Sequence, residues 1–146
     1  NLSHNKISDI SYLSNLISLN ELNLSDNDIS VLSESRKNTK DDDDTDYDKV
    51  SQSVFENMIY LTSLDLSNSN VEGSYSYRNS IDSSDLDDLD DLVSLNSLNL
   101  KGTDVGSLTN LEKLTTLTTL NLSNTDVTDL DSLKKLTNLT YLDLSN

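Results

Sequence analysis

Leucines recur along this chain at spacings of two and three, a pattern that fits neither a simple strand nor an ordinary helix. When the sequence is shifted by 22 residues, the pattern falls into register with itself from Leu2 to Leu24 and again from Leu100 to Leu144. The second leucine of each "LxL" pair recurs at Leu2, Leu24, Leu66, Leu100, Leu122 and Leu144. A fixed period of this length predicts a repeat architecture in which each repeat packs on its neighbours.

The first half of each repeat predicts a short strand followed by a turn. The two leucines of "LxL" share one face of a strand, because side chains alternate between the two faces. A polar residue then closes the turn by bonding backbone groups, and a β-branched residue follows it. The turn residues are Asn5, Asn27, Ser69, Thr103 and Thr125, and the β-branched residues are Ile7, Ile29, Val71, Val105 and Val127.

The second half of each repeat carries apolar residues at a strict spacing of three, as in "IxxLxxLxxL". On an α-helix such a stripe would drift by about 60° per step, whereas about three residues per turn keeps it in line. We therefore expect one solenoid over residues 1–146, with a parallel sheet on its concave side and little α-helix. Six strands should centre on the second leucines, joined by extended or 3₁₀ return legs.

These columns resemble the leucine-rich repeat in its short form. "ISDISYLSNLISLNELNLSDNDIS" and "TDVTDLDSLKKLTNLTYLDLSN" are most similar to the repeats of internalin-type bacterial surface proteins, and also to those of the phosphatase-regulator class. The resemblance implies an α/β horseshoe or arc that binds other proteins. The first and last residues fall inside repeats, and solenoids cover their end leucines with caps. We therefore expect this chain to be an uncapped fragment of a longer protein.

Two repeats exceed the period, which predicts insertions at 33–54 and 72–88. Both follow a strand and its turn in neighbouring repeats, so we expect them to leave the solenoid from one edge. They bring tyrosines and an arginine, the residue types that anchor interfaces. This gives a first candidate surface, the insertion edge: Tyr47, Tyr75, Tyr77 and Arg78.

The first insertion also contains "DDDDTDYD", in which Asp42, Asp44, Asp46 and Asp48 alternate. Oxygen ligands at this spacing can converge on Ca²⁺. The segment lacks the glycine and the final glutamate of a calcium loop, however, so a solvated acidic loop is the favoured interpretation.

The second candidate surface is the concave face, where leucine-rich repeats usually bind. The residues beside the paired leucines are small and polar, with Tyr141 as the only aromatic one. The candidate contact residues on this face are Glu21, Asn23, Asp65, Asn99, Lys101, Asn121, Tyr141 and Asp143.

The net charge of −16 argues against nucleic acid or an anionic membrane as a partner and favours a basic protein. No apolar run is long enough to span a membrane. The sequence has no cysteine and a single histidine, His4, without a partner nucleophile. We therefore expect no enzyme, no cofactor and no metal site beyond the weak calcium candidate.

The sequence thus predicts a protein–protein recognition module. The internalin resemblance favours part of a longer, adhesin-like protein at the cell surface or outside the cell. The phosphatase-regulator resemblance leaves a cytoplasmic scaffold or regulatory subunit as the alternative.

Overall fold

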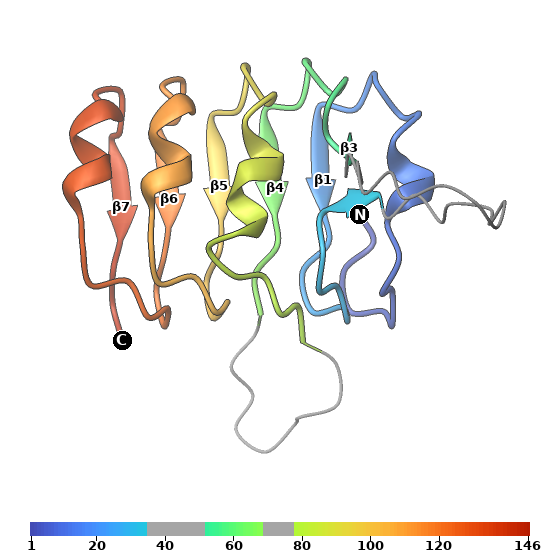
Figure 1. Cartoon of the computed structure of the whole chain (residues 1–146), viewed down its shortest axis with the longest axis horizontal. Helices are drawn as coiled ribbons and strands as arrows, with labels where there is room; N and C mark the ends of the chain where they lie inside the picture. Colours follow the sequence, from blue (N-terminus) through green and yellow to red (C-terminus); the bar gives the residue numbers. More distant parts are fainter. Residues whose placement is uncertain (35–51, 69–77) are drawn as a thin grey trace, which may run out of the picture.

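The computed structural model describes residues 1–34, 52–68 and 78–146. These residues form a solenoid in which a parallel sheet faces a row of short 3₁₀ helices (Figure 1). The elements in chain order are η1 (Ser11–Leu13), β1 (Glu21–Asn23), β2 (Ser33–Glu34), β3 (Gln52–Ser53), β4 (Ser63–Asp65), η2 (Asp85–Leu89), β5 (Ser97–Asn99), η3 (Thr109–Lys113), β6 (Thr119–Asn121), η4 (Asp131–Lys135) and β7 (Tyr141–Asp143). The predicted leucine-rich repeat architecture is confirmed.

The main sheet has five strands in the order β1-β4-β5-β6-β7, all parallel. Each strand centres on the first leucine of its pair, such as Leu64 or Leu98, and not on the second as predicted. The second leucines lie just beyond the strands, yet their amides continue the ladder. The Leu66 amide, for example, donates to the Asn99 carbonyl at 2.9 Å. The chain bends toward the turn at these residues, which ends the regular strand.

The Leu2 segment is bonded to the sheet without forming a strand. Its amide donates to the Asn23 carbonyl at 2.8 Å, and the amide of His4 donates to Ser25 at 3.0 Å. The described residues therefore hold five parallel strands of the main sheet, and the predicted sixth strand is absent from them.

The leucine columns form one continuous core between the sheet and the return legs. Leu98, Leu100 and Leu120 are completely buried, as are Leu89 and Leu92 on the return side. The residues at spacing three turn inward because a 3₁₀ helix brings every third side chain to the same side. The predicted 3₁₀ return legs are thus confirmed by η1 to η4.

Buried asparagines tie one coil to the next at the turns. Asn27 Nδ2 donates to the carbonyls of Leu2 and Leu24 at 3.0 and 2.9 Å, and its Oδ1 accepts from the Ile7 amide at 3.1 Å. Asn79 makes the same bonds one coil later, to Leu24 and Leu66, and accepts from the Ile29 amide. In this coil, Asn79 therefore occupies the column of polar turn residues, and the buried Ile81 occupies the column of β-branched residues.

The sequence had assigned those columns to Ser69 and Val71, and that assignment is wrong. Both residues lie outside the described part of the chain. The misalignment arose because counting 22 residues places the extra residues of the second insertion after the turn. In the structure, most of the extra length lies between Asn68 and Asn79.

The two insertions leave the coil at different places, contrary to the expectation of one shared edge. The first is closed by an antiparallel pair, β2 with β3, which lies against η2 on the return side. The Ser53 hydroxyl donates there to the Asp88 carbonyl. The second is closed in the turn after β4, where the Asn79 amide donates to Asn68 Oδ1 at 2.8 Å.

Candidate recognition surfaces

The concave face presents three polar columns, contributed by equivalent positions of successive strands. The central column lies between the paired leucines and consists of Asn23, Asp65, Asn99, Asn121 and Asp143, all of them half-buried. Because the strands are in register, these side chains stand one above another along the sheet. The predicted concave residues are therefore brought together by the fold.

Each side chain of the central column is held by a local hydrogen bond. Its Oδ1 accepts from the backbone amide two residues later, at 2.9 Å for Asn121 with Ser123 and 3.0 Å for Asp143 with Ser145. Where that later residue is serine, its hydroxyl donates to the same oxygen. One carboxylate or amide oxygen in each coil is thus used to fix the side chain, and these bonds do not involve its second polar atom.

Charge and bulk are concentrated at a few positions around this column. Tyr141 is 54% exposed and provides the largest apolar group on the face, and Glu21 is exposed at the opposite end. The pKa of Asp143 is lowered, first by the hydrogen bond from the Ser145 hydroxyl, then by the Ser145 amide, with a smaller effect of Lys101. The face therefore presents fixed amide and carboxylate groups with one lysine beside them.

The insertion edge is described only in part. Tyr47, Tyr75 and Tyr77 lie outside the described residues, and so do the calcium candidates Asp42, Asp44, Asp46 and Asp48. Arg78 is described, and its guanidinium forms an ion pair with Asp104 of the next coil. Within residues 1–34, 52–68 and 78–146, no group of three His, Cys, Asp or Glu side chains is placed to hold a metal ion.

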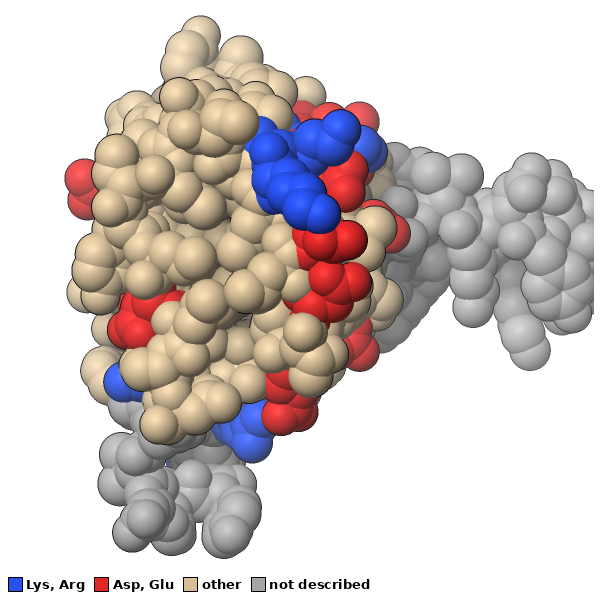
Figure 2. Space-filling model, turned by 90° about the vertical axis from the view of Figure 1, so that its left-hand side faces the viewer, with Lys and Arg blue, Asp and Glu red and all other residues tan. Residues whose placement is uncertain are grey.

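Acidic residues gather on the return side at η2, which contacts β3 at the end of the first insertion. The pKa of Asp88 is raised to about 6, first by burial and then by the charges of Asp85 and Asp87. Burial also raises the pKa of Asp85. Lys113 from η3 forms an ion pair with Asp90, the residue that follows η2, and we call the acidic residues from Asp85 to Asp91 the acidic row. Figure 2 views the β7 end, where most of the surface is uncharged and the charged side chains gather on the return side.

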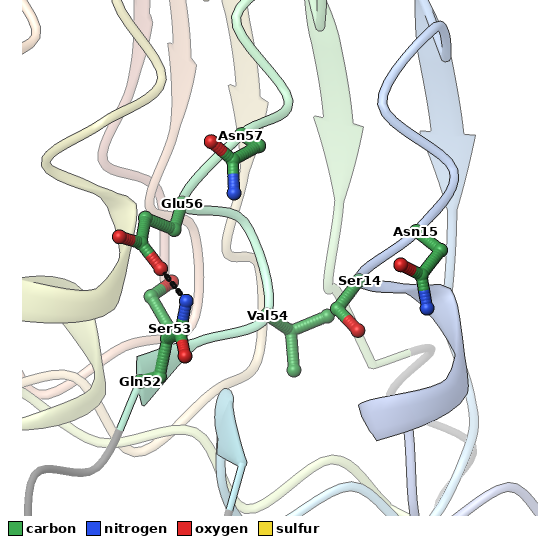
Figure 3. A pocket seen from close by; sticks show the side chains of 7 residues that line it. All are labelled: Ser14, Asn15, Gln52, Ser53, Val54, Glu56 and Asn57. Carbon is green, nitrogen blue, oxygen red and sulfur yellow. Dashed lines mark hydrogen bonds between the residues drawn. The ribbon is translucent and has the colours of Figure 1, made fainter.

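A polar hollow of about 280 Å³ lies between the first two coils on the return side (Figure 3). It is lined by the backbone and side chains of Ser14, Asn15, Gln52, Ser53, Val54, Glu56 and Asn57. The Gln52 amide donates to the Glu56 carboxylate at its rim. The lining residues that the structure describes include no histidine or cysteine.

His4, the single histidine, lies elsewhere, in the turn of the first coil. Its Nδ1 is 3.1 Å from a carboxylate oxygen of Asp26, the equivalent residue of the next coil. Both have positive φ, as do Gly102 and Asn124 at the same position of later coils. Sequence reasoning missed this column, although His, Asp, Gly and Asn are the residues that best tolerate a left-handed turn. His4 thus has a turn role.

Comparisons with known proteins agree with this geometry. Residues 115–146 match the family described as "Leucine Rich repeats (2 copies)", and residues 15–31 match "Leucine Rich repeat". The chain is a leucine-rich repeat protein with internalin-like repeats. The segment between the two matches contains both insertions, which interrupt the period on which such a match depends.

Two solved structures of proteins from Listeria monocytogenes resemble this leucine-rich repeat protein over 97% of its length. One is internalin C2, with 25% identity and a TM-score of 0.68, and the other is an internalin (inlF), with 27% identity and a TM-score of 0.53. The chain spans 48% and 39% of their respective lengths. No curated protein matches the sequence. No helix in the described residues is long and apolar enough to cross a membrane.

Proposed function

We propose that this leucine-rich repeat protein is a protein–protein recognition module that binds its partner through the concave face. One observation carries the proposal: the central column is fixed in register by hydrogen bonds within each coil. A surface fixed in this way loses little conformational entropy when a partner binds. The contact residues are Glu21, Asn23, Asp65, Asn99, Lys101, Asn121, Tyr141 and Asp143.

The proposal is one of binding and not of catalysis. The leucine-rich repeat fold typically serves as a scaffold for interactions, and the concave column offers amide, carboxylate and hydroxyl groups bonded to each other. The net charge of −16 favours a basic partner, because complementary charge speeds association and excludes acidic competitors.

We also propose that the chain belongs to a longer, adhesin-like protein at a bacterial surface. The support is the internalin-like repeat and the similarity to two internalins, which the chain matches over about half of their length or less. A cytoplasmic scaffold or regulatory subunit is the alternative. Fractionation of the source cells with an antibody against this chain separates the two, because only the surface protein is removed by mild protease treatment of intact cells.

The second candidate is the predicted insertion edge, now divided between two places, with Tyr47 in the first insertion and Tyr75, Tyr77 and Arg78 in the second. Its support is the residue types, because tyrosine and arginine supply much of the binding energy at interfaces. Shortening both insertions to the 22-residue period should leave binding unchanged if the concave face is the main surface.

The concave proposal is tested with residues that the chain itself uses in the same columns. Asn99→Asp and Asn121→Asp keep the Oδ1 acceptor, as Asp65 and Asp143 show, but remove the amide donors. Tyr141→Thr copies Thr119. The partner is first captured from cells and identified by mass spectrometry, and its affinity is then measured by calorimetry with both purified proteins.

The combined concave variant should bind at least about tenfold more weakly, a loss of roughly 1.4 kcal/mol. The matched control is Ser30→Asp with Thr128→Asp, which adds the same charge at exposed positions outside the concave face. If the control changes binding as much as the concave variant does, the added charge alone explains the effect and the proposal is wrong.

A further inference from the structure

A row of exposed apolar side chains runs along the edge where the chain enters the strands, the upper edge in Figure 1. Ile17, Ile59 and Val93 each lie four residues before the first residue of β1, β4 and β5, so the strand register places them in successive coils. They are 49%, 46% and 62% exposed, and Tyr60 beside Ile59 is 59% exposed. We call these four residues the apolar ridge.

The exposure of Ile59 and Val93 is not an effect of the chain ends. Ile59 and Val93 lie in coils that have another coil on each side. The preceding residues, Met58 and Leu92, are fully buried and supply the core at this level. The next two coils place Thr115 and Thr137 in the ridge column, so the fold does not require an apolar residue there. A contiguous exposed apolar strip marks an interaction surface.

Hydrogen bonds between coils hold the backbone beneath the ridge. Asn20 Nδ2 donates to the Tyr60 carbonyl at 3.2 Å, and the Thr62 amide donates back to the Asn20 carbonyl at 2.8 Å. The Thr116 hydroxyl donates to the Val93 carbonyl at 3.3 Å. The backbone of the ridge is therefore fixed before any partner arrives, which lowers the entropic cost of docking.

Acidic residues flank the ridge on the return side. Glu56 precedes Ile59 by three residues, and Asp90 and Asp91 precede Val93 by three and two. Lys113 already binds in this row: its pKa is raised by its hydrogen bond to Asp90, then by the charges of Asp90, Asp87 and Asp91. This contact shows that the row accepts an ammonium group. The same negative charge, together with −16 for the chain, opposes docking of a second copy.

The spacing of the ridge indicates the shape of the partner. Successive coils of a parallel sheet are about 4.8 Å apart, close to the 5.4 Å of one helical turn. Alternate residues of an extended strand are about 6.6 Å apart and would lose register after the second coil. We propose that the apolar ridge docks an amphipathic helix of another protein, whose apolar face is flanked by lysine or arginine. This surface is separate from the concave face and goes beyond the function proposed above.

The probe for this inference is a fluorescein-labelled amphipathic Leu/Lys peptide of about 18 residues, long enough to form a helix. Its binding to the whole chain is followed by fluorescence anisotropy. The variant Ile17→Thr/Ile59→Thr/Val93→Thr copies the ridge column of the last two coils and should bind on the order of tenfold more weakly. Conversely, Thr115→Val/Thr137→Val extends the ridge by two coils and should bind more tightly.

Two peptides serve as controls: a Leu/Glu peptide of the same pattern and a Leu/Lys peptide with its sequence scrambled. Both should bind weakly. The inference is overturned if the wild-type chain does not bind the amphipathic peptide, if the scrambled peptide binds equally well, or if neither ridge variant changes the affinity. The concave variant should bind the peptide as tightly as the wild-type chain does. The two proposals are therefore tested independently: the ridge inference can fail while the concave proposal stands, and the concave proposal can fail while the ridge inference stands.

Discussion

At the scale of single residues, the polar side chains that matter most in this protein are buried and serve the backbone. Asn27 and Asn79 each bond to carbonyls of two coils, which would otherwise be buried without donors. Thr103 and Thr125 do less, since each hydroxyl donates to one carbonyl at 2.7 Å within its own coil. The turn residues of the repeat are therefore equivalent in position but not in energy.

We expect Asn79→Ala to lower the free energy of unfolding by roughly 3 kcal/mol, because three buried hydrogen bonds are lost. Thr125→Ala should lower it by only about 1 kcal/mol, because one bond is lost. Urea denaturation followed by circular dichroism measures both. Equal losses for the two variants would contradict the bridging role of Asn79.

Asp88 makes the stability of the folded protein depend on pH, and the sign of that dependence follows from the pKa shift. Its pKa in the folded protein is raised to about 6 from 3.8, mainly by burial. The folded state therefore binds more protons than the unfolded state between these values, and stability falls as the pH rises through that window. Asp88→Asn should raise the urea midpoint at pH 7 and change it little at pH 3.5. Asp87→Asn at an exposed neighbouring position is the control.

At the scale of elements, each strand is stabilised by the coils on either side of it. Leu120 on β6 is completely buried between β5 and β7, whereas the equivalent Leu142 on β7 is 39% exposed. The strands of the main sheet have only three residues each, so regular backbone hydrogen bonding extends little beyond one leucine. The stability of an element depends on its position in the stack and not on its own sequence.

Leu120→Ala should cost about 2–5 kcal/mol of unfolding free energy, because the buried leucine leaves a cavity between coils. Leu142→Ala removes the same atoms from the same column but should cost markedly less, since part of the side chain already faces solvent. Thermal unfolding of both variants tests the stacking. Similar losses would mean that β7 is packed as deeply as β6.

At the scale of the whole molecule, the solenoid is nearly one-dimensional, because each coil contacts its neighbours. Such a molecule opens most readily from its ends. The amides of Leu66 and Leu100 donate to the carbonyls of Asn99 and Asn121 in the middle of the stack. The amide of Leu2 donates to the carbonyl of Asn23 in the first coil.

We therefore expect the amides of Leu66 and Leu100 to exchange with solvent more slowly than the amide of Leu2, although all three are hydrogen-bonded. Hydrogen exchange followed by nuclear magnetic resonance resolves the individual amides. Uniform protection along the stack would show that the coils open as one cooperative unit.

The sequence by itself determined the period, the parallel sheet, the 3₁₀ return legs and the leucine core, because these depend on spacings repeated in nearly every coil. It also placed the concave column correctly, since that column alternates with the leucines. The tertiary structure decided that Asn79 and not Ser69 holds the third turn, because the buried carbonyls of Leu24 and Leu66 require a donor that bridges two coils.

Only the tertiary structure showed where the insertions leave the coil and which apolar residues remain exposed. Ile59 follows the buried Met58 directly in the sequence, and both are apolar. The direction of each side chain is set by the bend from return leg to strand, and that bend is fixed by bonds to the neighbouring coil, such as that from the Thr62 amide to Asn20. A repeated spacing identifies the column, but contacts between coils decide which way it faces.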